Sequence, residues 1–209
     1  MEAFLQGLLL TLGLIATIGA QNAMLIKQGL LRQHVFTVAS LFFLCDIVLM
    51  SLGVYGLGLF LAKSPVASLI LAVLGSLFLL VYGYRSAVSA YKGGASLNTD
   101  GSSPKQALGK VISLALALTL LNPHVYLDTV VIIGGIAVTL SEADKLHFLL
   151  GCLLSSGLWF YGVGFGSRLL VPCFRKPLMW RLLDGFTALI MWLIAYSMLA
   201  YAFDLMKQF

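Results

Sequence analysis

Six long apolar stretches, separated by short polar connections, account for most of this chain. A helix of about 20 apolar residues crosses the hydrocarbon of a bilayer, so this pattern predicts six membrane-spanning helices. The predicted segments cover residues 4–26, 35–62, 65–84, 107–140, 147–171 and 182–203. The fourth segment is much longer than a crossing requires, which indicates that it does not run as one straight helix.

The connection between the third and fourth segments differs from the others in composition. Residues 92–106 read KGGASLNTDGSSPKQ, and this Gly, Ser and Asn content is typical of an aqueous loop. The loop divides the chain into residues 1–91 and 107–209, with three predicted helices in each half. An odd number of helices per half inserts the second half upside down, as in the inverted repeats of many transporters.

Each half also carries polar, helix-breaking residues inside apolar surroundings. GAQNAMLIKQG (19–29) closes the first segment, and LNPHVYLDTVVIIGG (121–135) interrupts the fourth. Gly19 lets the backbone open, and Pro123 removes a helical hydrogen bond. Membranes tolerate such breaks where protein or water covers the freed backbone groups, so we expect both to line a cavity; a simple proline kink is the alternative. The predicted fold class is therefore an all-α integral membrane protein with six helices in two inverted three-helix repeats, broken in the first and fourth segments.

Composition excludes a soluble domain, because 60% of the residues are apolar, 10% are charged and the mean hydropathy is +1.00. The net charge of +5 could suggest nucleic acid, but the distribution of Lys and Arg is more informative. Alternating the connections places ten of the thirteen on one side: Lys27, Arg32, Arg85, Lys92, Lys105, Lys110, Arg168, Arg175, Lys176 and Arg181. Lys63, Lys145 and Lys207 fall on the other side. Positive residues stay in the cytoplasm, so both termini are expected to be periplasmic.

Two acidic residues lie deep in the apolar segments. Asp46 is about 11 residues, or roughly 16 Å, inside the second segment, close to the middle of a core about 30 Å thick. Asp128 follows the break in the fourth. A membrane carboxylate is costly and faces the bundle interior or a water-filled cavity. No Lys or Arg lies in the interior of these two segments, so a proton, a metal ion or a cationic substrate is expected to arrive from outside. Protonated, purely structural acids are the alternative.

Neutral polar residues cluster beside both breaks. The amides of Gln21, Asn22 and Asn122 both donate and accept hydrogen bonds, so they suit the carboxylate or ammonium of an amino acid. His124 suits a proton relay, or an interior hydrogen bond. Elsewhere, Gly162 and Gly166 are expected to form a close-packing GxxxG face. The residues expected to pack or to anchor at the interface are Trp159, Tyr161, Trp180 and Trp192.

These residues resemble a known family. GAQNAMLIKQG, Asp46, LNPHVYLDTVVIIGG and GLWFYGVGFG follow the order and spacing of the LysE/ArgO-type bacterial lysine and arginine exporters, from about residue 5 to residue 201. The resemblance implies an inner-membrane exporter of L-arginine, L-lysine or both. Ala20 stands where the family often has Pro, so a break in the first segment has to rely on Gly19 and its polar neighbours.

Three other functions compete with cationic amino-acid export. A divalent-metal transporter needs at least three converging ligands, and Asp46, Asp128 and His124 are the candidates. A membrane enzyme needs a nucleophile–base pair or a metal cluster, and neither HExxH nor SxxK occurs. Export of neutral amino acids is the third. The widely spaced Cys45, Cys152 and Cys173 indicate neither zinc nor disulfides.

The sequence thus predicts a secondary exporter with no catalytic residues, resident metal or cofactor. The residues assigned to substrate binding are Asp46, Asp128, Gln21, Asn22 and Asn122; to proton coupling, Asp46, Asp128 and His124; and to the helix breaks, Gly19 and Pro123. Spacing leaves open which acid binds substrate and which carries the proton. The expected partners are L-arginine, L-lysine, protons and membrane lipid, without nucleic acid, and homodimer formation is left open.

Overall fold

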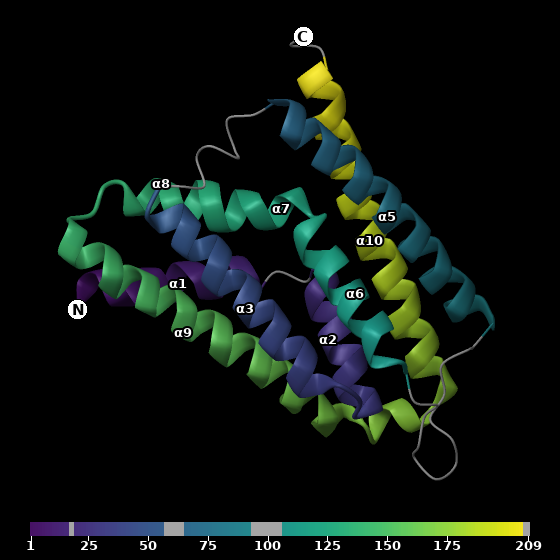
Figure 1. Ribbon diagram of the computed structural model, residues 1–209. Helices are drawn as coiled ribbons and strands as arrows, with labels where there is room; N and C mark the ends of the chain where they lie inside the picture. Colours follow the sequence, from purple (N-terminus) through teal and green to yellow (C-terminus); the bar gives the residue numbers. More distant parts are fainter. Residues whose placement is uncertain (17–18, 57–64, 93–105, 207–209) are drawn as a thin grey trace.

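The computed structural model describes residues 1–16, 19–56, 65–92 and 106–206, and every regular element in these ranges is helical (Figure 1). The elements are α1 (Glu2–Ile15), α2 (Ala20–Leu31), α3 (Val35–Val54), α5 (Pro65–Lys92), α6 (Leu108–Leu120), α7 (Pro123–Tyr126), the π-helical turn η1 (Leu127–Ile132), α8 (Ile133–Ala137), α9 (Glu142–Gly166), the 3-10 turns η2 (Ser167–Leu170) and η3 (Cys173–Arg175), and α10 (Pro177–Met206). The predicted loop at 92–106 falls mainly on residues outside the described ranges.

Four of these helices are long and apolar enough to cross a membrane, and two bent pairs of shorter helices bring the number of candidate spans to as many as six. The bent pairs are α1 with α2 and α6 with α7–α8, so each interrupted span coincides with one of the two polar stretches in the sequence. The chain is therefore consistent with a multi-pass membrane protein.

Several helices extend beyond the apolar segments that predicted them. The third segment was expected to end at Tyr84, but α5 continues to Lys92, which the sequence had placed in the loop. Similarly, α9 begins at Glu142, before the predicted start at His147, because Ser141 caps it. The Ser141 Oγ accepts a hydrogen bond from the Asp144 backbone N–H at 3.2 Å. The polar capping turn at Ser141 explains why hydropathy alone placed the start of α9 too late.

The helices form two groups in space. In one group α1 and α3 both pack along α9, while in the other α5 and α10 lie side by side (Figure 1). The partner of α6 is α3, and η1 and α8 also pack against α3. Thus α3 and α9 form the centre of the first group, and both broken spans pack on them.

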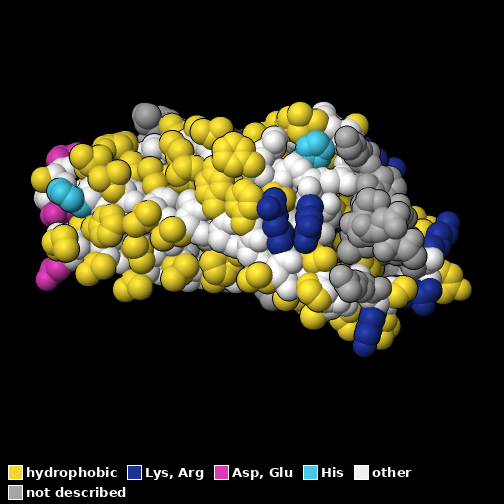
Figure 2. Space-filling model, turned by 90° about the horizontal axis from the view of Figure 1, so that it is seen from below, with side chains coloured by type: hydrophobic (Ala, Val, Ile, Leu, Met, Phe, Trp, Pro, Cys, Tyr) yellow, Lys and Arg dark blue, Asp and Glu magenta, His cyan; other side chains and the backbone are white. Residues whose placement is uncertain are grey.

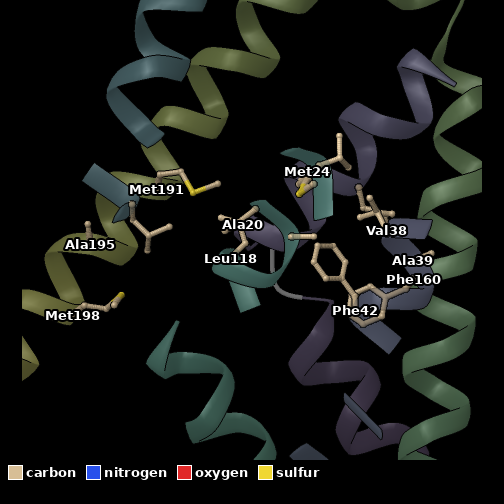
Figure 3. Close-up of a cluster of buried hydrophobic side chains, with 14 residues drawn as sticks. Ala20, Met24, Val38, Ala39, Phe42, Leu118, Phe160, Met191, Ala195 and Met198 are labelled. Atoms are coloured by element: carbon tan, nitrogen blue, oxygen red, sulfur yellow. The ribbon is translucent and has the colours of Figure 1, made fainter. Parts of the chain in front are cut away.

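A cluster of buried apolar side chains joins the two groups. Six helices contribute to it, with Met24 on α2, Phe42 on α3, Leu79 on α5, Leu118 on α6, Phe160 on α9 and Met191 on α10 (Figure 3). The rings of Phe42 and Phe160 lie 5.4 Å apart between centroids in a tilted arrangement. This cluster packs the N-terminal part of α2 against the rest of the bundle.

Large apolar side chains cover much of the outer surface. Leu44 on α3, Leu158 on α9 and Leu193 on α10 are each more than half exposed. Figure 2 shows apolar side chains over most of one face, acidic side chains at one end of it, and Lys and Arg toward the other end. Lipid is the environment in which such a surface is stable.

Glycines bring α3 into direct backbone contact with the second broken span. A Cβ on Gly53 would overlap the carbonyl oxygen of Thr129 in η1, and one on Gly134 would lie 2.7 Å from the carbonyl oxygen of Gly53. The expected GxxxG face was wrong, because a Cβ on Gly162 or Gly166 would meet no atom within 4 Å. The sequence pattern could not identify which face of α9 meets another helix.

We predict that Gly53→Ala destabilises the protein, because the added methyl meets backbone atoms that cannot move aside without separating α3 from η1. The expected loss is about 1–3 kcal/mol of unfolding free energy, measured as a lower unfolding temperature in detergent. Gly135→Ala is the matched control, since its Cβ would enter open space and Ala favours helix by about 1 kcal/mol over Gly. Equal destabilisation by both substitutions would contradict the close contact.

Candidate functional site

A cavity of about 240 Å³ lies where the two broken spans meet α3. Its wall includes side chains or backbone from α1, α2, α3, η1, α9 and α10. Seven residues singled out from the sequence lie on this wall: Gly19, Gln21, Asn22, Asp46, Asn122, His124 and Asp128. Residues one hundred positions apart in the chain therefore share a single cavity.

The first break turns the chain by 79° between α1 and α2. Gly19 immediately precedes α2 with φ −110° and ψ 178°, which is extended backbone that any residue adopts, so the conformational freedom of glycine is not required there. The first four N–H groups of a helix have no partner within it. Gly19, Ala20 and Gln21 lie on the cavity wall, so the N-terminal end of α2, with its partial positive charge, borders the cavity.

The second break turns the chain by 60° between α6 and the helix that follows. Asn122 accepts a hydrogen bond through its Oδ1 from the backbone N–H of His124 at 3.1 Å. Pro123 is the first residue of α7, a position where its missing N–H removes no helical bond and its fixed φ favours the start of a helix. The side chain of Asn122 thus acts as the cap of the new helix.

The two acids reach the cavity from different helices. Asp46 on α3 is only 4% exposed, and its Oδ2 accepts a hydrogen bond of 2.7 Å from the Ser156 hydroxyl on α9. Asp128 belongs to η1, and π-helical turns are rare and concentrated at functional sites. Both Asp46 and Asp128 line the cavity. No Lys or Arg lies among the described residues that line this cavity.

The Gln21 and Asn22 side chains connect α2 to other helices. Gln21 donates through Nε2 to the Thr119 hydroxyl on α6 at 2.9 Å. Asn22 donates through Nδ2 to the carbonyl of Ile15 at 2.9 Å and accepts through Oδ1 from the indole N–H of Trp159 at 3.0 Å. Each amide therefore has a structural partner besides its place on the cavity wall.

Three partners of the site were not identified from the sequence: Ser156, Thr119 and Trp159. Ser156 could have been recognised from the sequence, because Ser155 and Ser156 form a pair of hydroxyl residues inside an apolar segment. Trp159 was expected to pack or to anchor at the interface, but its N–H bonds to Asn22 in the interior of the bundle. Nothing in the spacing of α2 and α9 indicated that these two side chains meet.

A third buried acid lies outside the cavity. Asp184 on α10 is 1% exposed and pairs with the Lys27 ammonium on α2 at 2.6 Å, while Ser89 on α5 donates to its other oxygen at 2.6 Å. Asp184 falls within the sixth apolar segment, but only Asp46 and Asp128 were predicted from the sequence as membrane acids. A Lys one position beyond the end of the first segment neutralises it, so Asp184 has a basic partner, whereas no ion pair of Asp46 or Asp128 occurs among the residues that the structure describes.

The donors on the cavity wall do not resemble a metal centre. Within the described ranges, no three His, Cys, Asp or Glu side chains come together in a way that could hold an ion. Asp46, Asp128 and His124 all border the cavity, but a divalent ion prefers a larger set of converging oxygen or nitrogen ligands.

Broken helices around a cavity inside an apolar helical bundle recur in membrane transporters. The sequence profile of the LysE type translocator family matches residues 12–202, and the chain belongs to this family. It is 38% identical to the protein named YggA from Aeromonas salmonicida, over 90% of both chains. It is 36% identical to the arginine exporter protein ArgO from Salmonella schwarzengrund, over 93% of this chain and 92% of the relative. No solved structure matches the chain.

Proposed function

We propose that this protein exports cationic amino acids, L-arginine, L-lysine or both, from the cytoplasm in exchange for protons. The observation that carries the proposal is the pair of carboxyl groups, Asp46 and Asp128, on the wall of one cavity whose described lining contains no Lys or Arg. A buried acid without a basic partner favours a cationic ligand or a proton. The relative named as an arginine exporter supports arginine as one substrate.

The cavity also suits the other end of an amino acid. The N-terminal end of α2, at Gly19, Ala20 and Gln21, borders the same space as the acids. Free backbone N–H groups and the positive end of the helix dipole favour a carboxylate. In our proposal the substrate's α-carboxylate lies at the start of α2 and its side-chain cation near Asp46 and Asp128. The volume of about 240 Å³ is just below the usual range of ligand pockets, about 300–1,000 Å³, which favours one small molecule.

The two halves of the chain support a mechanism based on inverted repeats. We propose residues 1–91 and 107–209 as the repeats, with 92–106 as a cytoplasmic linker. In these repeats α1 corresponds to α6, α3 to α9 and α5 to α10. The observed packing fits this correspondence, because α3 packs on α9 and α5 on α10, and because α1 packs on α9 just as α6 packs on α3. Helices broken near the middle of the membrane are a recurring place for substrate in such transporters.

The charge distribution supports a single orientation in the bacterial inner membrane. Ten of the thirteen Lys and Arg residues fall on one side when the connections alternate, and the positive-inside rule makes that side cytoplasmic. Both termini are then periplasmic. A C-terminal fusion to a reporter that works only outside the cytoplasm is predicted to be active. Activity of a cytoplasm-only reporter at the same position would contradict this orientation.

The first functional prediction concerns the two acids. Asp46→Asn or Asp128→Asn removes a negative charge but keeps the size of the side chain, so each should lower uptake of labelled arginine into inverted membrane vesicles at least about tenfold, the equivalent of 1.4 kcal/mol. The amount of protein in the membrane should not change, and Glu should restore part of the activity. Asp144→Asn, at the exposed start of α9, is the control and should transport normally. A fully active Asp46→Asn protein, or uptake of Mn²⁺ instead of arginine, would exclude the proposal.

The second functional prediction concerns how export of a cationic amino acid is coupled to proton entry. Export of one positive charge against an inside-negative potential costs about 2.3 kcal/mol per 100 mV, or about fiftyfold in concentration. A carboxyl group that holds either a proton or the substrate's cation, but not both, enforces one-for-one exchange and removes this electrical cost. Asp46 or Asp128 is the proposed group, with His124 as a relay. In liposomes, an imposed pH gradient should drive arginine movement, whereas a potassium-diffusion potential alone should have little effect. Transport that follows voltage and ignores pH would contradict proton exchange.

A further inference from the structure

The indole of Trp159 and the amide of Asn22 form a contact that the transport proposal does not use. Trp159 is on α9, Asn22 is on α2, and the carbonyl of Ile15 ends α1, so two hydrogen bonds connect three helices at the first break. We infer that Trp159 is a positioning residue, which acts through Asn22 to hold the N-terminal end of α2 against the substrate cavity. This inference rests on the proposed function.

The two bonds determine the orientation of the Asn22 amide. An indole N–H only donates, so the group facing Trp159 must be the Asn22 oxygen. A backbone carbonyl only accepts, so the group facing Ile15 must be the amide nitrogen. Reversing the amide would place its NH₂ group against the indole N–H and its oxygen against the Ile15 carbonyl. Neither pair can form a hydrogen bond, so only the observed orientation is stable.

The bond to Ile15 satisfies a group that the break leaves exposed. The last carbonyls of a helix have no partner within it, and lipid supplies none. Asn22, which is only 7% exposed, reaches back from the first turn of α2 to bond the last carbonyl of α1. The direction in which α2 leaves the break thus depends on this side chain keeping its place.

Trp159 lies outside the wall of the substrate cavity. A second cavity of about 290 Å³ is lined by Trp159 and otherwise by apolar residues, such as Val163 and Phe186, together with Asn22. Asn22 is on the walls of both cavities, so it separates the polar space from the apolar one. On the apolar side the Trp159 indole N–H bonds the Asn22 oxygen, and loss of this N–H would remove one of the two bonds that orient the amide.

The test is Trp159→Phe, which removes the N–H and keeps an aromatic ring. If the start of α2 binds the substrate's carboxylate, the KM for arginine should rise about tenfold, as expected for one lost hydrogen bond in a buried site. The inhibition constant of agmatine, which is arginine without its carboxylate, should change less than about twofold. Trp192→Phe, on a partly exposed face of α10, is the matched control and should change neither constant. An equal rise for arginine and agmatine, or no rise, would overturn the inference.

A double-mutant cycle tests whether Trp159 acts through Asn22. In an Asn22→Ala background, Trp159→Phe should lose the part of its effect on the arginine KM and on the unfolding temperature in detergent that comes from the hydrogen bond, so the two substitutions should be less than additive. Additive effects of the two substitutions would show that they act independently and would reject the inference. The unfolding cycle needs no substrate, so it gives a result even if the wild-type protein fails to exchange arginine for protons. That failure in the wild type would reject the proposed function, whereas active wild type with an additive cycle rejects only the role of Trp159.

Discussion

Lipid offers no hydrogen bonds, so a helix that is interrupted inside a membrane must have its freed N–H and C=O groups bonded by the protein or by a water-filled space. This chain interrupts two spans and meets the requirement with asparagine at both. Asn22 bonds the last carbonyl of α1, and Asn122 caps the first turn of α7. The cavity lies between these two helix interruptions. The first N–H groups of α2, which no carbonyl of the helix satisfies, border this cavity.

The low polarity of the membrane interior also explains why the three buried acids differ in their bonding partners. Asp184 is neutralised by Lys27 and bonded by Ser89, so it joins α10 to α2 and α5 within the folded chain. Asp46 has one hydroxyl donor, Ser156, and Asp128 lies on a π-helical turn, and both border the cavity. A buried acid that is paired with a basic side chain joins helices, whereas a buried acid without a basic partner favours binding of a proton or a cation.

Close backbone contact brings together the two helical segments that carry the acids. Gly53 allows α3, which carries Asp46, to touch the backbone of η1, which carries Asp128. Gly134 extends this contact toward α8. Any residue with a Cβ at these positions would meet the facing backbone and push the two segments apart. The glycines therefore affect the site although neither lines it.

Hydropathy and residue type were sufficient for the helical membrane architecture, for the positions of both interruptions and for Asp46, Asp128, Gln21 and Asn122 as cavity residues. These features are local, because a run of apolar residues, a proline or a lone carboxylate in such a run has the same physical consequence in any fold. The contacts across helices were decided only by the tertiary structure. It pairs Trp159 with Asn22 and Lys27 with Asp184, and it leaves Gly162 and Gly166 open while Gly53 is in contact. Which faces of two helices meet depends on packing angles and rotation, and residues as far apart as 22 and 159 carry no periodic signal that relates them.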